Sequence, residues 1–351
     1  MNTDNFWKGK KVLVTGGTGF LGSYIVDTLI SKGAYLKVID FRKPSAMIGN
    51  IEFWEGDIRN IDLLFDLCKG IDYVFHLAAM PSIARGKPQD YYSINVKGTQ
   101  NLLDAAYHNN VRKVMHVSSS TVYGIPNCFP LKENSPLKPI GKYGKSKLEA
   151  ENVCRRFMDR GMNISIIRPR VIIGPGRIGI FSILFSQVAK GDNVYILGKG
   201  NNIFQFTHVS DMTNACLAAA QKTGSDLFNV GCDDIRPVKE QMLNLIKHAK
   251  SKSRIVCIPS LPARFLLRTL NILGVSPLVD EQFMIADKNF KLDTSYAQEK
   301  LKWKPRYSNL DSLLQAYDWY MLHRNETRVQ YKSIFSVFGK FKNSRMGGFQ
   351  S

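Results

Sequence analysis

One segment near the N-terminus constrains the fold more than any other, because three glycines recur there at a spacing of three. Gly16, Gly19 and Gly22 follow the short β-branched run at residues 11–14 and precede an apolar-periodic stretch at residues 20–30. This order predicts a strand, a tight turn and a helix. Gly16 permits the turn, Gly19 lets the backbone approach a pyrophosphate, and Gly22 lets the helix pack on the sheet. The segment therefore predicts a dinucleotide site at a helix N-terminus.

An acidic residue further along the chain indicates which dinucleotide this turn binds. Asp40 ends the next predicted strand, at residues 35–40. A carboxylate at that place can accept hydrogen bonds from the adenosine ribose hydroxyls and repels a 2′-phosphate. We therefore expect NAD. Arg42, two residues on, keeps NADP as the less favoured alternative.

Strands and helices go on alternating after this first unit. Further strands are predicted at residues 71–77, 111–118 and 164–168, and helices at 61–69, 91–109 and 145–160. This alternation predicts an α/β fold, a Rossmann-type doubly wound parallel sheet with helices on both faces.

The regular alternation ends after Pro169. A helix is predicted at 181–190, and residues 194–209 are typical of a loop with a short strand. We therefore expect an NAD-binding domain at 1–168, with some later segments returning to it. A smaller C-terminal substrate-binding cap is expected mainly within 169–325, followed by a basic aromatic tail at 326–351.

Composition excludes several classes of protein. Of the 351 residues, 44% are hydrophobic and 22% are charged, which is enough apolar side chain for a large core and excludes a mainly disordered chain. No apolar run reaches the length of a membrane-spanning helix, and the N-terminus lacks the pattern of a secretion signal. The six cysteines form no close pair, so we expect buried, reduced thiols, a cytoplasmic location and no metal site.

The net charge is unusually positive, at +19. Such a field attracts phosphates, nucleic acid or an anionic membrane. No nucleic-acid-binding motif accompanies the charge, so nucleic acid is not an expected partner. Residues 331–351 are basic and aromatic and contain no acid, which fits either a frayed terminus or peripheral contact with an anionic membrane at the inner face.

A tyrosine and a lysine provide candidate chemistry. Tyr143 and Lys147 stand four residues apart, so on a helix they share one face. An ammonium beside a phenol favours the phenolate, and this predicts a general base near neutral pH. The serines at 118–120 offer a hydroxyl for the substrate oxygen that loses or gains the proton.

These motifs together make the chain resemble an extended short-chain dehydrogenase/reductase of the NAD-dependent epimerase/dehydratase family, over residues 9–322. The resemblance rests on TGGTGFLG at 15–22, GDI at 56–58, HLAA at 76–79, NVKGT at 95–99, SSSTVYG at 118–124, YGKSK at 143–147, RP at 168–169, GPG at 174–176, HVSD at 208–211 and a C-terminal W-x-P pattern.

The resemblance implies roles for residues at the matching positions. Tyr143 would take the proton of a substrate hydroxyl, Ser119 would share that hydrogen bond, and Lys147 would lower the tyrosine pKa and hold the nicotinamide ribose. Hydride would pass to nicotinamide C4; an epimerase returns it to the other face of the keto intermediate, whereas a dehydrogenase releases NADH.

The resemblance also implies which residues contact the ligands. Besides the glycines, Asp40 and the catalytic pair, implied cofactor contacts are Phe20, Leu21, Arg42, Asp57, Ile58, Leu77, Ala78, Ala79, Asn95 and Pro169. Implied substrate contacts are Ser82, Ser120, Arg170, Arg177, Phe204 and His208.

Four departures from the family pattern bear on the substrate. Ser120-Thr121 stand where dehydratases of the family carry Asp-Glu, so dehydration is not expected. Val171 replaces an asparagine common in nucleotide-sugar enzymes, and Phe204-Gln205 replace the Arg-Asp whose arginine clamps a diphosphate. The loop at 80–87 is also short for a sugar-nucleotide epimerase.

Three functions therefore stay open, with the first preferred. One is epimerisation of a nucleotide-linked sugar, with Arg170, Arg177, Lys199 or Arg236 as alternative diphosphate ligands. Another is oxidoreduction of an apolar or lipid-linked ring alcohol, because residues 198–202, Phe206-Thr207 and the apolar stretch 262–278 resemble the 3β-hydroxysteroid dehydrogenase-like branch. That stretch would line a lipid pocket, dock on a membrane or form an ordinary cap helix. The third and least favoured function is a non-catalytic NAD-binding sensor. Such proteins commonly lose the tyrosine or the lysine of the catalytic pair, and both are present here. The family resemblance also implies a homodimer.

Overall fold

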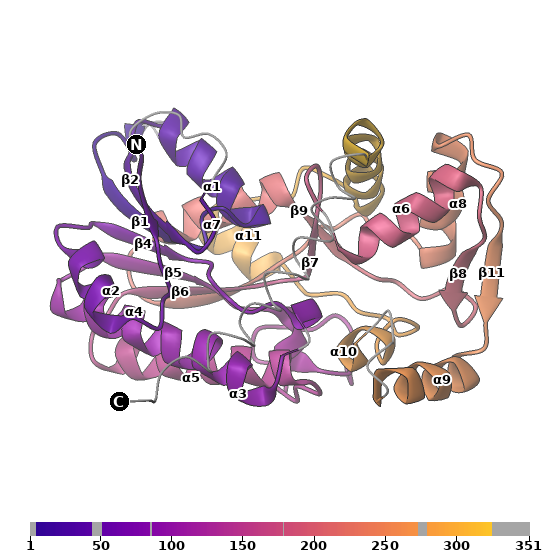
Figure 1. Cartoon of the computed structure of the whole chain (residues 1–351), viewed down its shortest axis with the longest axis horizontal. Coiled ribbons are helices and arrows are strands. Elements are labelled where there is room, and N and C mark those ends of the chain that lie inside the picture. The colour runs from indigo at the N-terminus through magenta and orange to yellow at the C-terminus, as the bar shows by residue number, and fades with distance from the viewer. Residues whose placement is uncertain (1–4, 44–50, 85, 178, 273–278, 325–351) are drawn as a thin grey trace, which may run out of the picture.

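A seven-stranded parallel sheet forms the centre of the computed structural model, which describes residues 5–43, 51–84, 86–177, 179–272 and 279–324 (Figure 1). The strand order is β10-β6-β5-β4-β1-β2-β3, and every neighbouring pair is parallel. The strands are β1 (Lys11–Thr15), β2 (Tyr35–Asp40), β3 (Ile51–Glu55), β4 (Tyr73–His76), β5 (Lys113–Val117), β6 (Ile164–Pro169) and β10 (Asp226–Val230). The order reverses between β1 and β4, and at such a point the carboxyl ends of the strands leave a crevice.

Helices cover both faces of this sheet, which confirms the predicted α/β doubly wound fold (Figure 1). One face carries α1 (Phe20–Ser31), α7 (Val209–Gln221) and α11 (Ser295–Leu301), and the other carries α2 (Ile61–Cys68), α4 (Gly98–His108) and α5 (Lys142–Asp159). Successive residues of β1 point to opposite faces. Val14 joins the core beneath α1 and α7, and Leu13 joins the core beneath α2, α4 and α5.

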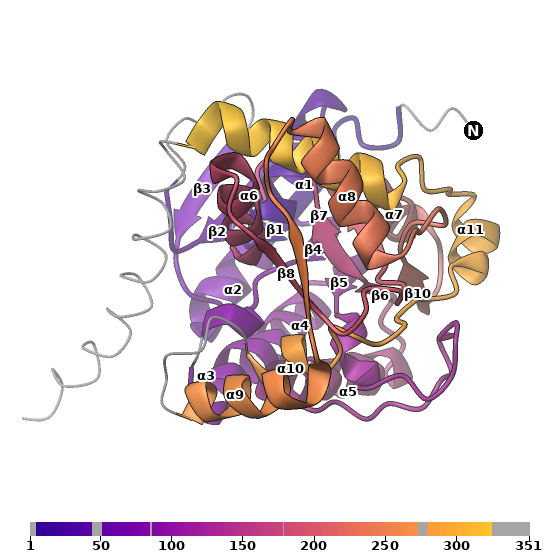
Figure 2. The same ribbon diagram turned by 90° about the vertical axis from the view of Figure 1, so that its right-hand side faces the viewer.

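A second group of elements packs at one end of the sheet (Figure 1). It contains α6 (Ile180–Lys190), β8 (Val194–Leu197), α8 (Val238–His248), β11 (Ile255–Ile258) and a helix at 309–324. β8 pairs with β11, and β7 (Val171–Ile173) pairs with β9 (Phe206–His208). Phe185, Leu245, Leu313 and Tyr317 belong to the core of this group. In both views α9 (Ser260–Ile272), α10 (Asp280–Phe283) and α3 (Pro88–Tyr91) lie along the lower edge of the molecule (Figures 1 and 2).

Two strands of the central sheet, β3 and β10, lie outside the strands predicted from the sequence. Both are at sheet edges, where only one neighbouring strand supports them. In β3 the sequence Ile-Glu-Phe-Trp-Glu leaves no residue buried, so it lacks the apolar run typical of an inner strand. β10 carries segment 226–230 back to the sheet beside β6.

The single helix predicted at 91–109 is broken in the structure. A π-helix at Tyr92–Lys97 separates α3 from α4. Its Asn95 side chain accepts a hydrogen bond from Met80 N (2.6 Å) and donates to Met80 O (3.2 Å) and Ser146 Oγ (2.8 Å). These tertiary bonds distort the helix locally, and such π-segments often occur at functional sites.

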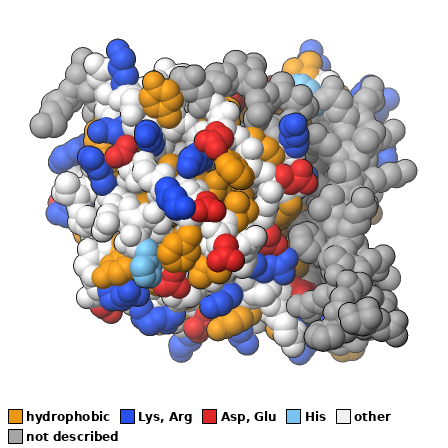
Figure 3. All heavy atoms as spheres, turned by 60° about the vertical axis from the view of Figure 1, so that its left-hand side comes forward, with side chains coloured by type: hydrophobic (Ala, Val, Ile, Leu, Met, Phe, Trp, Pro, Cys, Tyr) orange, Lys and Arg blue, Asp and Glu red, His pale blue; other side chains and the backbone are white. Residues whose placement is uncertain are grey.

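Charges are mixed on the face shown in Figure 3, where basic and acidic side chains are interspersed. No helix in the described parts of the chain combines the length and apolar character needed to cross a bilayer.

All six cysteines are free, but only Cys68, Cys154, Cys216 and Cys232 are buried. Cys128 and Cys257 are exposed, so the expectation that all the thiols are buried is wrong for these two. The predicted tail at 326–351 lies outside the described residues, and with a single chain present the homodimer stays a prediction.

Candidate active site

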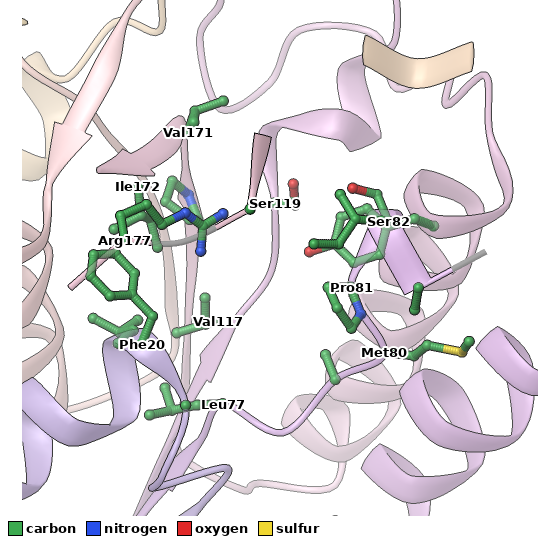
Figure 4. A pocket seen from close by; sticks show the side chains of 18 of the residues that line it. Phe20, Leu77, Met80, Pro81, Ser82, Val117, Ser119, Val171, Ile172 and Arg177 are labelled. Carbon is green, nitrogen blue, oxygen red and sulfur yellow. The ribbon is translucent and has the colours of Figure 1, made fainter. Parts of the chain in front are cut away.

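A cavity of about 1490 Å³ lies at the carboxyl ends of the central strands. Its walls come from the glycine turn, the ends of β2, β5 and β6, the loop after β4, α6 of the second group, and α10. Figure 4 shows Phe20, Val117, Ser119 and Arg177 around this space, with Met80 to Ser82 on the opposite wall. The cavity therefore joins the predicted dinucleotide site to the predicted catalytic residues.

The glycine turn is shaped so that side chains cannot enter it. Gly16 has φ 72°, and a Cβ there would lie 2.7 Å from Ala78 N. A Cβ on Gly22 would lie 2.1 Å from Gly16 O. Gly19 is the N-cap residue of α1, and no side chain caps that helix. The first N–H groups of α1 thus face the cavity without a side-chain partner from the helix cap, which fits a phosphate-bearing ligand.

Asp40 lies beside this turn, as predicted for a ribose ligand. Its carboxylate accepts hydrogen bonds from Thr18 N (3.1 Å) and Phe41 N (2.8 Å), and it lines the cavity together with Arg42. The backbone bonds fix the orientation of the carboxylate. Asp57 instead pairs with Arg59 at 2.5 Å and is not among the lining residues, whereas its neighbour Ile58 lines the cavity.

The loop after β4 forms the next wall. Leu77, Ala78 and Ala79 line the cavity, as do Phe20 and Leu21 of α1 and Pro169 of β6. Asn95 lies outside the lining and fixes the Met80 backbone through the bonds described above. Asn95 therefore shapes this wall without facing the cavity.

Ser119 and Tyr143 lie together at the centre of the cavity. Tyr143 stands in the first turn of α5, which begins at Lys142, three residues before the predicted start. The Ser119 side chain lies close enough to oppose the rise of the Tyr143 pKa that burial causes, and its Oγ accepts a hydrogen bond from Thr121 N at 3.2 Å. Both residues line the cavity. The phenol and the serine hydroxyl can therefore contact one substrate oxygen.

Contrary to the sequence-based expectation, the pKa of Tyr143 is raised in this structure. Lys147 lies in the second turn of α5. Its ammonium is buried and donates a 2.6 Å hydrogen bond to Val117 O, and it does not line the cavity. Burial lowers the pKa of Lys147 to about 8. Burial, together with the Glu281 carboxylate, raises the pKa of Tyr143 to about 12.

Glu281 is a site residue that the sequence reasoning missed. Its Oε1 accepts a hydrogen bond from Gly144 N at 3.1 Å, at the start of α5, and it lines the cavity near Tyr143. Its Oε2 is buried with no partner among the described residues, and burial raises the pKa of this carboxyl. A signal existed in the sequence, because Asp280 and Glu281 are the first acids after residues 241–279, which contain none.

The structure brings five of the six predicted substrate residues to the cavity and leaves one outside. The five that line it are Ser82, Ser120, Arg170, Arg177 and Phe204. His208 instead caps α7, accepting from Ser210 N at 3.2 Å, and stacks on Tyr307 with ring centroids 3.8 Å apart. The assignment of His208 to substrate binding is therefore corrected to a structural role.

Arg170 is the most unusual of these groups. Its side chain is 3% exposed and lies between the rings of Phe204 (4.1 Å) and Phe290 (3.9 Å). It donates a long 3.4 Å bond to Ser120 Oγ, while Nε and Nη2 have no partner among the described residues. Burial lowers its pKa to about 9. Such a cation is suited to an anionic group of a ligand.

The cavity wall beyond Arg170 is apolar. Its lining there comes from α6, β9, α8, the segment after α10 and the helix at 309–324, and includes Ile180, Phe181, Leu184, Phe206, Val238, Met242, Ile285, Ala286 and Trp319. None of residues 262–270 of the apolar stretch is among the lining residues, so that part does not form a lipid pocket. Residues 273–278 lie outside the described parts of the chain.

Comparison with known proteins assigns the fold and site to a family. The model of the NAD dependent epimerase/dehydratase family matches residues 12–231. The chain belongs to this family. It is 29% identical to a UDP-glucose 4-epimerase of Lactobacillus helveticus, covering 89% of this chain and 98% of that enzyme. It is 28% identical to the mouse (Mus musculus) sterol-4-alpha-carboxylate 3-dehydrogenase, decarboxylating, covering 80% of each chain.

A solved structure of a family member adds the cofactor. The UDP-glucuronic acid 4-epimerase of Bacillus cereus, determined in complex with NAD, matches with a TM-score of 0.74 and 26% identity, over 89% of this chain and 99% of that one. The chain is thus an NAD-dependent enzyme of the extended short-chain dehydrogenase/reductase type. The glycine turn, which a Cβ at Gly16 or Gly22 would fill, is consistent with this cofactor. In the described residues, no group of three or more His, Cys, Asp or Glu is arranged to hold a metal.

The Glu281 carboxylate leads to a prediction on pH dependence. A base that must lose its proton gains activity as pH rises towards its pKa, and Glu281 keeps the Tyr143 pKa high. Glu281→Gln keeps an oxygen for Gly144 N and removes the charge. We expect its pH–rate profile to move to lower pH, with a rate at pH 7 about threefold to tenfold higher.

The measurement is kcat/KM from pH 6 to pH 10 for the wild type and the variant, with roughly unit steps in pH. Glu240→Gln is the control, because Glu240 is exposed and pairs with Arg236 away from the cavity. An unchanged profile for Glu281→Gln would contradict the electrostatic coupling to Tyr143.

Proposed function

We propose that the enzyme epimerises a secondary alcohol on a nucleotide-linked sugar through a transient keto intermediate. The observation that carries this proposal is a single cavity that holds the glycine turn, the Ser119–Tyr143 pair and the unpaired cation Arg170. Family relatives named as UDP-sugar 4-epimerases match this chain over almost their whole length.

Proton transfer is assigned to Tyr143 and Ser119. The Tyr143 oxygen takes the proton of the substrate hydroxyl, and Ser119 holds the same oxygen through a hydrogen bond. Bound NAD supplies the hydride acceptor, and later the donor, at its nicotinamide ring. Tyr143 returns the proton after the keto group has presented its other face. Asp40 and the start of α1 would hold the adenosine ribose and the pyrophosphate.

Arg170 and Arg177 are proposed to hold the diphosphate. Arg170 offers two nitrogens, Nε and Nη2, without a partner among the described residues, and the buried Nε of Arg177 also lacks one. The Arg177 guanidinium lies 5.2 Å from the centre of the Phe20 ring, beside the glycine turn (Figure 4). The two cations would replace the arginine that is missing at Phe204.

A specific observation favours a second candidate, the oxidation of an apolar or lipid-linked ring alcohol. The cavity wall beyond Arg170 is formed by aromatic and aliphatic side chains, and a relative of similar coverage is named as a sterol dehydrogenase. The same base and the same cofactor serve this reaction, with NADH released at the end of each turnover.

The experiment that tests the proposal is an epimer assay. Purified enzyme is incubated with UDP-glucose, UDP-N-acetylglucosamine or UDP-glucuronic acid without added NAD, and the epimers are separated by chromatography. The proposal expects conversion of at least one substrate. Conversion of none of them, together with NAD reduction by an apolar ring alcohol, would favour the second candidate.

Arg170 gives a prediction on substrate affinity. Arg170→Met keeps an unbranched apolar stem between the two rings but removes the guanidinium, so the diphosphate loses a hydrogen-bonded cation. We expect KM for the nucleotide sugar to rise about tenfold to 100-fold, with a smaller change in kcat. Arg156→Met is the control, because Arg156 is exposed on α5 and does not line the cavity. A KM within about twofold of the wild-type value would contradict this role for Arg170.

A further inference from the structure

Helix α9 has an apolar face that nothing in the described structure covers. Leu261 is 80% exposed, Phe265 77% and Leu266 58%. With Pro262 and Thr269, which are also exposed, these residues follow the spacing i, i+1, i+4, i+5 and i+8, and therefore form one stripe along the helix. Exposed single apolar residues are common, but a continuous stripe of large ones marks an interaction surface.

The opposite face of α9 is anchored to the wall of the cavity. Arg264 Nη2 donates to Met284 O at 3.2 Å and forms an ion pair with Asp287. The segment that it contacts includes Glu281, Ile285 and Ala286, which line the cavity on the inner side. The exposed stripe thus lies on the outer side of a segment whose inner side faces the cavity.

Charge indicates what kind of surface would bind this stripe. Residues 241–279 contain no acid, and their basic residues are Lys247, Lys250, Lys252, Arg254, Arg264 and Arg268. Arg268 is exposed on α9 itself, one turn after Arg264. The whole chain carries a net charge of +19. An amphipathic helix such as α9, with large apolar residues, the basic residues Arg264 and Arg268 and no acid, fits the interface of an anionic bilayer.

We propose that the stripe formed by Leu261, Pro262, Phe265, Leu266 and Thr269 docks the enzyme on an anionic membrane, with α9 lying in the plane of the interface. Leu261, Phe265 and Leu266 enter the boundary between headgroups and acyl chains, while Arg268 contacts the headgroups. The docking brings the cavity wall at 281–286 close to the membrane surface. This inference is independent of the epimerase proposal, because it concerns the outer surface alone.

The test is co-sedimentation of the full chain with phosphatidylcholine vesicles, prepared with and without phosphatidylglycerol. We expect sedimentation with the anionic vesicles, and a vesicle affinity reduced at least about tenfold in the Leu261→Ser/Phe265→Ser double variant. Leu322→Ser is the matched control, because Leu322 is 82% exposed on the helix at 309–324, away from α9. Leu261, Phe265 and Leu322 are all exposed, so the thermal midpoints of both variants should equal that of the wild type.

Three results would overturn the proposal. One is equal sedimentation of the double variant and the wild type, which would place any membrane contact elsewhere in the chain. Another is equal affinity for neutral and anionic vesicles. The third is a wild type that forms a dimer in gel filtration and does not bind vesicles, together with a double variant that is a monomer. A second copy of the chain would then cover the stripe.

Discussion

Replacing Tyr143 by phenylalanine should reduce turnover at least about 1000-fold while leaving NAD binding and the fold intact. The substitution removes one oxygen, which is the only atom of this side chain that can carry the proton in the proposed reaction. The ring stays, so the packing at the start of α5 is preserved. Ser119 keeps its bond from Thr121 N, and the glycine turn is untouched.

The control for this experiment is Tyr195→Phe, since Tyr195 is exposed on β8 and does not line the cavity. Turnover is measured by epimer separation, and NAD content is measured by denaturing each protein and quantifying the nucleotide released. A Tyr143→Phe variant that keeps more than about a tenth of wild-type turnover would show that another group moves the proton.

Gly22→Ala should have the largest effect on cofactor binding, with NAD affinity reduced at least about 100-fold. The added Cβ would lie 2.1 Å from Gly16 O and 2.7 Å from Gly17 Cα. Both are backbone atoms, so the turn itself has to move and the first N–H groups of α1 move with it. The phosphate site is therefore lost even where the rest of the sheet survives.

A matched substitution separates this effect from the general cost of replacing a glycine. Gly161 has φ 89°, and a Cβ there would meet no atom within 4 Å. Gly161→Ala is expected to lower stability by about 1 kcal/mol through backbone strain while leaving NAD affinity unchanged. Isothermal titration with NAD and thermal unfolding of both variants check the pair. Wild-type NAD affinity in Gly22→Ala would contradict the geometry assigned to the turn.

The parts of the fold that the sequence predicts well are those fixed by local pattern. The glycine turn, Asp40 and the Tyr143–Lys147 spacing depend on neighbouring residues, and the structure places the strand, turn and helix where the pattern indicates them. The π-helix at 92–97 could not be predicted, because it depends on bonds from Asn95 to Met80 and Ser146 on other segments. The edge strand β3 escaped prediction because none of its residues is buried.

The residues of the site also divide into those that a local sequence pattern predicts and those whose role depends on contacts with distant segments. Glu281 contacts Gly144 across 137 residues of sequence, so no local pattern links it to the catalytic tyrosine. His208 was misassigned because capping α7 and stacking on Tyr307 are tertiary roles for a residue in a functional motif. Lys147 has the predicted spacing, but its ammonium is bonded to Val117 O, and only the structure shows this partner.

The nucleotide content of the purified enzyme tests the central claim most directly. An epimerase returns the hydride within the same active site, so the cofactor is regenerated without leaving the cavity. Each preparation is denatured, and the released NAD, NADH, NADP and NADPH are quantified against protein. The account predicts close to one NAD(H) per chain, retained through purification, with no NADP. An empty protein that binds added NAD weakly, or one that carries NADP, would contradict it.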